Sequence, residues 1–145
     1  MSTYKVCLIG DSGVGKTSWL DRLMGEEIES MYRQFEVVES KEKEKFGGLR
    51  VDEYRDSDCC IIMYDVSKLL TARNISCWIR DYRNTCPNNP IIIVGNKMDL
   101  GVSKFEKRIP ILGKNEKLVR ISVKKGINIK SPLTLISNTL ANNSI

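Results

Sequence analysis

A glycine-rich stretch near the start of the chain has the residue types and spacing of a phosphate-binding loop. It matches the pattern G-x-x-x-x-G-K-[ST] at residues 10–17. The glycines allow successive backbone N–H groups to turn toward one anion, and the start of a following helix adds partial positive charge. Lys16, expected to be exposed without a ligand, would reach the β- and γ-phosphates, and the Thr17 hydroxyl would bind Mg²⁺. The predicted phosphate contacts are Gly10, Asp11, Ser12, Gly13, Val14, Gly15, Lys16, Thr17 and Ser18.

A second polar segment, residues 96–99, has the chemistry to select a base. The carboxylate of Asp99 can accept two N–H bonds from a guanine edge, and adenine offers no such pair of donors. Leaving those groups unpaired is costly, so the site would favour guanine. Alone, the segment could also be a polar turn after a strand; beside a phosphate-binding loop it favours a guanine site formed by Asn96, Lys97 and Asp99.

A third segment, Ser122-Val123-Lys124, carries a weaker signal of the same kind. It ends the last apolar run before the C-terminal helix. It would supply a backbone N–H group to the oxygen of the base, with Val123 and Lys124 as additional base contacts.

Alternating apolar and amphipathic stretches predict the elements that hold these segments in place. Strands are expected over residues 4–9, 34–38, 59–66, 90–95 and 118–123, and helices over residues 16–24, around Ile75 and from Ser131. The alternation is typical of βαβ units, and it predicts an α/β fold with a doubly wound, mostly parallel sheet of about five strands and helices on both faces. Because ligands bind at the carboxyl ends of such strands, the three polar segments should lie at one rim.

Spacing and capping residues predict which helix faces are buried. In the first helix Leu20, Leu23 and Met24 are expected to face inward. Ser67 is a candidate N-cap for the second helix, and Ser131 for the last. Two further inward stripes are predicted, namely Ile75, Trp78, Ile79 and Tyr82 in the second helix and Leu133, Ile136 and Leu140 in the last.

Length and composition narrow the class of protein. The 145 residues are expected to form one domain, residues 1–145, large enough to bury a core. No stretch approaches the ~18 apolar residues of a membrane span, and no signal peptide is evident. Five cysteines, an odd number, are expected to be reduced, as in the cytoplasm or nucleus. The adjacent Cys59 and Cys60 should point to opposite faces of a strand, which argues against a metal pair.

The net charge of +5 is concentrated in residues 104–125, from Lys104 to Lys125, where eight basic and two acidic residues give +6. A solvated face and a docking surface for an acidic protein fit this charge equally well. Nucleic acid is a poorer fit, because Phe105 is the sole aromatic residue of the segment that could stack on a base.

The three polar segments, in this order, resemble those of small GTPases of the Ras superfamily. Four runs are similar to the Ran branch: Lys45-Phe-Gly-Gly-Leu-Arg50, Cys60-Ile-Ile-Met-Tyr-Asp-Val66, Trp78-Ile-Arg-Asp81 and Gly95-Asn-Lys-Met-Asp99. The resemblance implies a P-loop NTPase fold, GTP or GDP with Mg²⁺ as ligands, GTP hydrolysis and a role in nucleocytoplasmic transport. A Rab-like GTPase is the alternative within the superfamily; the absence of a C-terminal cysteine for prenylation favours the Ran branch. A P-loop nucleotide kinase fits less well, because it does not explain the guanine segment.

The resemblance breaks where the family carries D-x-x-G-Q, because the chain has Glu39-Ser-Lys-Glu42-Lys43 there. Glu39 replaces the Asp that supports Mg²⁺ through water, and Glu42 replaces a Gly whose N–H meets the γ-phosphate. Lys43 replaces the Gln that orients the attacking water, and an ammonium cannot both accept from and donate to a water. No catalytic residue is therefore expected to be intact.

A second departure is a deletion. Thr17 and Glu39 are 22 positions apart, fewer than in the family, so the first switch and its Mg²⁺-binding Thr are expected to be missing and the strand at residues 34–38 to become the sheet edge. GTP hydrolysis is then expected to be very slow or absent. The rival to a GTPase is a non-switching decoy that occupies nuclear-transport partners.

The expected partners follow from charge and from the resemblance. The family's acidic C-terminal tail is missing, so the basic face from Lys104 to Lys125 is expected to meet an acidic partner such as a nuclear-transport receptor or an exchange factor. We expect a monomer with no lipid anchor.

Overall fold

A computed structural model describes residues 3–25, 34–39, 51–101, 113 and 115–143 of the chain. The elements follow in the order β1 (Tyr4–Gly10), α1 (Lys16–Gly25), β2 (Phe35–Glu39), α2 (Val51–Arg55), β3 (Cys59–Asp65), α3 (Leu69–Arg73), α4 (Ile75–Arg83), β4 (Ile91–Asn96), a short 3₁₀ helix (Met98–Leu100), β5 (Glu116–Arg120) and α5 (Ser131–Asn143).

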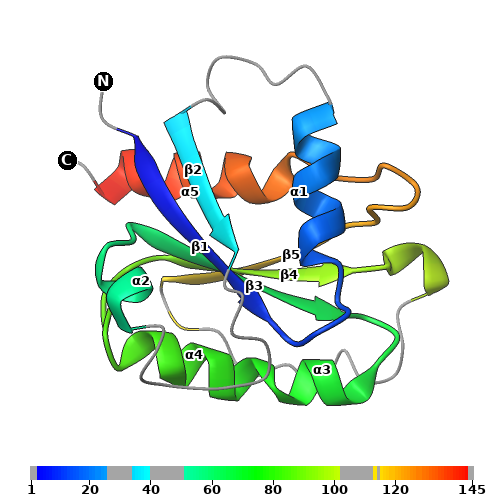
Figure 1. Cartoon of the computed structure of the whole chain (residues 1–145), viewed down its shortest axis with the longest axis horizontal. Coiled ribbons are helices and arrows are strands. Elements are labelled where there is room, and N and C mark those ends of the chain that lie inside the picture. Colours follow the sequence, from blue (N-terminus) through cyan, green and yellow to red (C-terminus); the bar gives the residue numbers. More distant parts are fainter. Residues whose placement is uncertain (1–2, 26–33, 40–50, 102–112, 114, 144–145) are drawn as a thin grey trace.

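The five strands form one sheet in the order β2-β1-β3-β4-β5, and every neighbouring pair is parallel. Helices α1 and α5 cover one face of the sheet, and α2, α3 and α4 cover the other (Figure 1). The predicted doubly wound α/β fold is confirmed, with β2 at the edge. The strand order reverses between β1 and β3, and the crevice outside the carboxyl ends of such strands is where this architecture binds ligands.

The central strands are apolar because helices bury them from both sides. Every residue of β3 and β4 is buried. Successive side chains alternate between two cores, so Cys59 packs under α1 and α5, and Cys60 packs under α2 and α4. The first core is built around Leu8, Trp19, Ile61 and Ile136, and the second around Ile9, Ile62, Trp78 and Tyr82.

The prediction for the inward face of α1 was partly wrong. Trp19 and Leu23 are buried, but Met24 is 80% exposed. At 100° per residue, Met24 lies roughly 90° from the centre of the stripe that faces the sheet. Trp19 takes the inward position and its indole N–H donates to the carbonyl of Ile129, 2.9 Å away.

Ser67 is not the N-cap of the second predicted helix. That helix is divided into α3 and α4 at Asn74, and α3 begins after Lys68. The Ser67 hydroxyl instead donates to Asp65 Oδ1 at 2.6 Å, which closes a turn at the end of β3. The last strand also begins and ends earlier than predicted, because pairing with β4 sets its register from Glu116.

All five cysteines are free, and four of them are buried. Burial raises the pKa of the Cys7 thiol to about 12 and raises the pKa of Cys59 and Cys60 as well, so these thiols are protonated. Within the part of the chain that the structure describes, no group of three or more His, Cys, Asp or Glu side chains could hold a metal ion. None of the described helices is long and apolar enough to cross a membrane.

Candidate nucleotide-binding site

The structure brings the three polar segments of the sequence to one edge of the sheet. The last residues of β1 to β5 are, in that order, Gly10, Glu39, Asp65, Asn96 and Arg120. The phosphate-binding loop follows β1, residues 96–99 follow β4, and residues 122–124 follow β5. Because all strands are parallel, these ends share the rim that the sequence predicted.

Two glycines allow the phosphate-binding loop to pack against the neighbouring strands. Gly10, with φ of 144°, lies so close to β3 that a Cβ would overlap the carbonyl oxygen of Met63. Gly15, with φ of 106°, lies against the side-chain amide of Asn96 at the end of β4. Only glycine fits both the space and the backbone conformation at these two positions.

Lys16 is buried, contrary to the expectation that it is exposed without a ligand. Its side chain is folded back into the loop, where the ammonium donates to the carbonyl of Gly10 at 2.7 Å and to that of Asp11 at 2.8 Å. A buried charge must be paired or hydrogen-bonded, and the loop carbonyls meet that need. The loop therefore holds a cation at the place where the sequence predicts phosphate.

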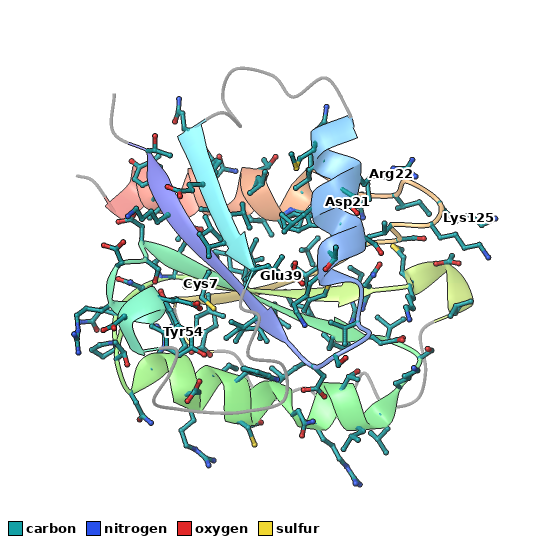
Figure 2. All side chains as sticks on the ribbon, in the orientation of Figure 1. Cys7, Asp21, Arg22, Glu39, Tyr54 and Lys125 are labelled. Carbon is teal, nitrogen blue, oxygen red and sulfur yellow. The ribbon has the colours of Figure 1, made fainter. Side chains whose placement is uncertain are left out.

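Thr17 and Glu39 meet where α1 begins and β2 ends. Figure 2 labels Glu39 at the end of β2. The Thr17 hydroxyl oxygen lies 2.8 Å and 3.0 Å from the two carboxylate oxygens of Glu39 and donates to them. Both residues are at the protein surface, beside the phosphate-binding loop. The residue expected to support Mg²⁺ thus lies against the residue expected to bind it.

Asn96 joins the three segments to one another. Its buried side-chain amide donates to the carbonyl of Val14 at 2.9 Å. Its side-chain oxygen accepts from the backbone N–H groups of Lys97, at 2.7 Å, and Val123, at 3.2 Å. Asn96, which the sequence predicts to contact the base, therefore links the phosphate-binding loop to residues 96–99 and 122–124 through hydrogen bonds.

Lys97 is held by a carboxylate that the sequence reasoning missed. It has a left-handed backbone, with φ of 68°, and its ammonium lies 2.9 Å from Asp65 Oδ2 and 3.3 Å from the carbonyl of Gly13. Burial opposes ionisation of Asp65, but hydrogen bonds from Ser67 and the ammonium of Lys97 outweigh it and lower the pKa of Asp65. The sequence did contain a signal for this role, because Asp65 is an acidic residue at the end of the otherwise apolar strand β3.

Asp99 is oriented by the loop that follows β5. Its Oδ1 accepts from the hydroxyl of Ser122 at 2.7 Å, and the Ser122 oxygen accepts from the N–H of Lys125 at 3.1 Å. Arg22 on α1 donates to the carbonyl of Val123 at 3.2 Å, and Figure 2 shows Arg22 on the side of the molecule where this loop lies. Sequence reasoning missed Arg22, because an Arg on an amphipathic helix has no distinguishing local pattern.

Two adjoining cavities connect these residues. One, here called the base cavity, has a volume of about 370 Å³ and is lined by residues that include Lys97, Asp99 and Lys124. The other, here called the phosphate-side cavity, has a volume of about 200 Å³ and is lined by residues of the phosphate-binding loop, Lys16 among them, and by Glu39 of β2. Three residues line both cavities: Gly13, Gly15 and Ser18. Their position makes one continuous depression from the predicted base segment to the start of α1.

Three predicted phosphate contacts, Gly10, Asp11 and Val14, do not line this depression. Gly10 is buried at the end of β1, where it pairs with Met63 of β3. Val14 is 1% exposed and packs in the core beneath α1 and α5. Asp11 is directed toward α4 instead, through contacts described below. Glu42 and Lys43 lie outside the described residues, as do residues 104–112 and 114 of the basic face.

The fold and the rim together define a nucleotide-binding α/β protein of the P-loop class. The family model of the Ras family matches residues 24–141 of the 145, and the chain belongs to the Ras family. The phosphate-binding loop precedes the matched residues, so two separate parts of the chain lead to the same class. The chain is accordingly a small-GTPase domain, of a family that binds guanine nucleotides with Mg²⁺.

Proposed function

We propose that the protein binds GDP and GTP in the depression formed by the two cavities. The observation that carries this proposal is the position of Asp99, which lines one cavity while Lys16 lines the adjoining one. A guanine edge can bond to the Asp99 carboxylate while its phosphates meet the Lys16 ammonium and the loop N–H groups. The chemistry of these donors and acceptors fits a guanine nucleotide from end to end.

The base oxygen requires a donor as well. The N–H of Val123 is donated to Asn96, so we assign this role to the N–H of Lys124, whose residue also lines the cavity. Lys97 is held by Asp65 along the same wall, where its aliphatic stem can cover a face of the base.

Mg²⁺ fits the pair Thr17 and Glu39. Neighbouring ligands of an octahedral Mg²⁺, each about 2.0–2.1 Å from the ion, are about 2.9 Å apart. The Thr17 hydroxyl oxygen lies at 2.8 and 3.0 Å from the Glu39 carboxylate oxygens, so the two residues are close enough to be neighbouring ligands, and a bound ion would replace the hydrogen bond between them. We propose that these two residues hold the ion, which when bound neutralises part of the phosphate charge.

The test of the base and phosphate assignment is a thermal-shift comparison. GDP with Mg²⁺ is expected to raise the melting temperature, and ATP at equal concentration to leave it unchanged, because adenine offers Asp99 no pair of donors. Replacing Mg²⁺ with EDTA should reduce the shift produced by GDP. Equal stabilisation by ATP and GDP would contradict the assignment of Asp99.

We propose further that the protein is Ran-like and takes part in nucleocytoplasmic transport, in the cytoplasm or nucleus. The four sequence runs that resemble the Ran branch support this proposal. Two of them, residues 60–66 and 95–99, contain the carboxyl ends of β3 and β4, which lie at the site. Acidic partners, transport receptors or an exchange factor, would dock on the basic residues 104–125, and salt would weaken that association. A decoy that does not switch, or a Rab-like protein, is the alternative.

GTP hydrolysis is expected to be slower than the ~10⁻⁴ per second that unaided small GTPases reach. The reaction depends on positioning of water and on stabilisation of charge, and Lys43 stands where the family has Gln. Single-turnover hydrolysis of labelled GTP, with and without a Ran-activating protein, measures the rate. Lys43→Gln alone should not restore it, because the first switch is also missing.

A parent protein that the activator stimulates a thousandfold would contradict both the low rate and the decoy alternative.

A further inference from the structure

Asp11, the second residue of the phosphate-binding loop, turns its side chain away from the phosphate-side cavity. Its Oδ2 accepts from the side-chain amide of Asn74 at 2.7 Å, and its Oδ1 accepts from the indole N–H of Trp78 at 2.9 Å. These donors are 63 and 67 positions away in sequence and come from the junction of α3 and α4. Each carboxylate oxygen thus has a donor from the same pair of helices.

The two donors are themselves held by the core. Trp78 is 2% exposed and packs among the residues beneath α4. Asn74 joins α3 to α4 with a helical backbone, and α3 is tied to the end of β3 because the Thr71 hydroxyl bonds the backbone of Asp65. The donors therefore have fixed positions relative to the sheet.

The loop is rich in glycine and depends on contacts with the rest of the fold for its order. Gly10, Gly13 and Gly15 all have positive φ, and glycine loses more backbone freedom on ordering than any other residue. The backbone carbonyl of Asp11 is held by the Lys16 ammonium, a bond that is lost if the ammonium turns to a phosphate. The side-chain bonds of Asp11 do not depend on Lys16 and would then hold this end of the loop.

The hydrogen bonds from Asn74 and Trp78 also determine where the negative charge of Asp11 lies. The phosphate-side cavity is lined by loop residues on either side of the Lys16 ammonium, and Asp11 is not among them. A carboxylate turned into this cavity would repel a phosphate. The amide and the indole keep the negative charge of Asp11 on the far side of the loop.

We propose that Asp11 is a positioning residue for phosphate, held by Asn74 and Trp78 so that the loop keeps its anion-binding shape when Lys16 engages the ligand. This inference rests on the proposed function and adds a link from the α3–α4 junction to the phosphate half of the site. It predicts that breaking the link weakens binding of GDP and leaves binding of the base unchanged.

The test compares variants in the full chain, with GDP and guanosine as the two ligands. Asp11→Ala should speed dissociation of GDP on the order of 10- to 100-fold, because two hydrogen bonds to a charged group are lost. Its affinity for guanosine should stay at the parent value. Asn74→Ala should act in the same direction with a smaller effect, and Asn84→Ala, an exposed Asn at the other end of α4, is the matched control without effect.

A conservative variant separates positioning from general damage to the loop. Asp11→Asn should recover most of the loss, because the Asn74 amide can rotate to present its oxygen to the new amide. In ¹⁵N spectra the indole signal of Trp78 should move in Asp11→Ala, while that of Trp19, bonded to Ile129, should stay in place.

Equal GDP dissociation from the parent and from Asp11→Ala and Asn74→Ala would overturn the inference and leave the proposed function intact. Equal loss of GDP and guanosine in Asp11→Ala would also overturn it, because the effect would then be general damage. A parent protein that binds no GDP would instead overturn the proposed function, and this inference with it.

Discussion

Lys16→Ala is expected to lower the affinity for GDP by on the order of 10²- to 10⁴-fold. The ammonium is the cation of the phosphate-side cavity, and bonds between charged partners contribute about 1.5–3 kcal/mol each. Two such bonds to phosphate oxygens correspond to that loss, at about 1.4 kcal/mol for each factor of ten. Competition against a fluorescent GDP analogue measures it.

The same substitution is also expected to lower the melting temperature of the nucleotide-free protein. Lys16 donates to the carbonyls of Gly10 and Asp11 in this structure, and its removal leaves both without that donor. Lys68→Ala is the control, an exposed Lys before α3, and it should change neither property. A Lys16→Ala protein that binds GDP like the parent would refute the assignment of the phosphate-binding loop.

Asp99→Ala is expected to abolish the preference for guanine over adenine nucleotides. The carboxylate lines the base cavity and is held there by Ser122, so its removal leaves the guanine N1–H and 2-amino group without an acceptor. The loss should be on the order of 10²- to 10⁴-fold in GDP affinity, with ATP unaffected. Parallel titrations of GDP and ATP against parent and variant provide the measurement.

Asp99→Asn sharpens this test. Asn keeps one acceptor oxygen and replaces the other by an N–H donor, so it no longer matches guanine but does match xanthine, which carries an oxygen at position 2. Binding should shift from GDP to xanthosine diphosphate while the phosphate contacts stay the same. A variant that retains the parent's preference for GDP would show that Asp99 does not read the base.

The sequence by itself was sufficient to determine the class of fold and the two ends of the site. Apolar runs of the length of β3 and β4 have few ways to be buried other than as central parallel strands, and their carboxyl ends must share a rim. The phosphate-binding loop and residues 96–99 are contiguous, so their chemistry is visible without a structure. Local patterns of this kind do not depend on distant partners.

Tertiary structure alone decided how these residues are held. Asp65 reaches Lys97, and Asp11 reaches Asn74 and Trp78, across gaps in sequence that no local pattern spans. Lys16 is buried because the loop carbonyls fold around its ammonium. A side chain's partners depend on which backbone groups the folded chain places nearby, and hydrogen bonds are directional over about 3 Å. The kind of site could therefore be predicted from the order of its residues. The hydrogen bonds and ion pairs that hold those residues in place form only when distant strands and helices come together.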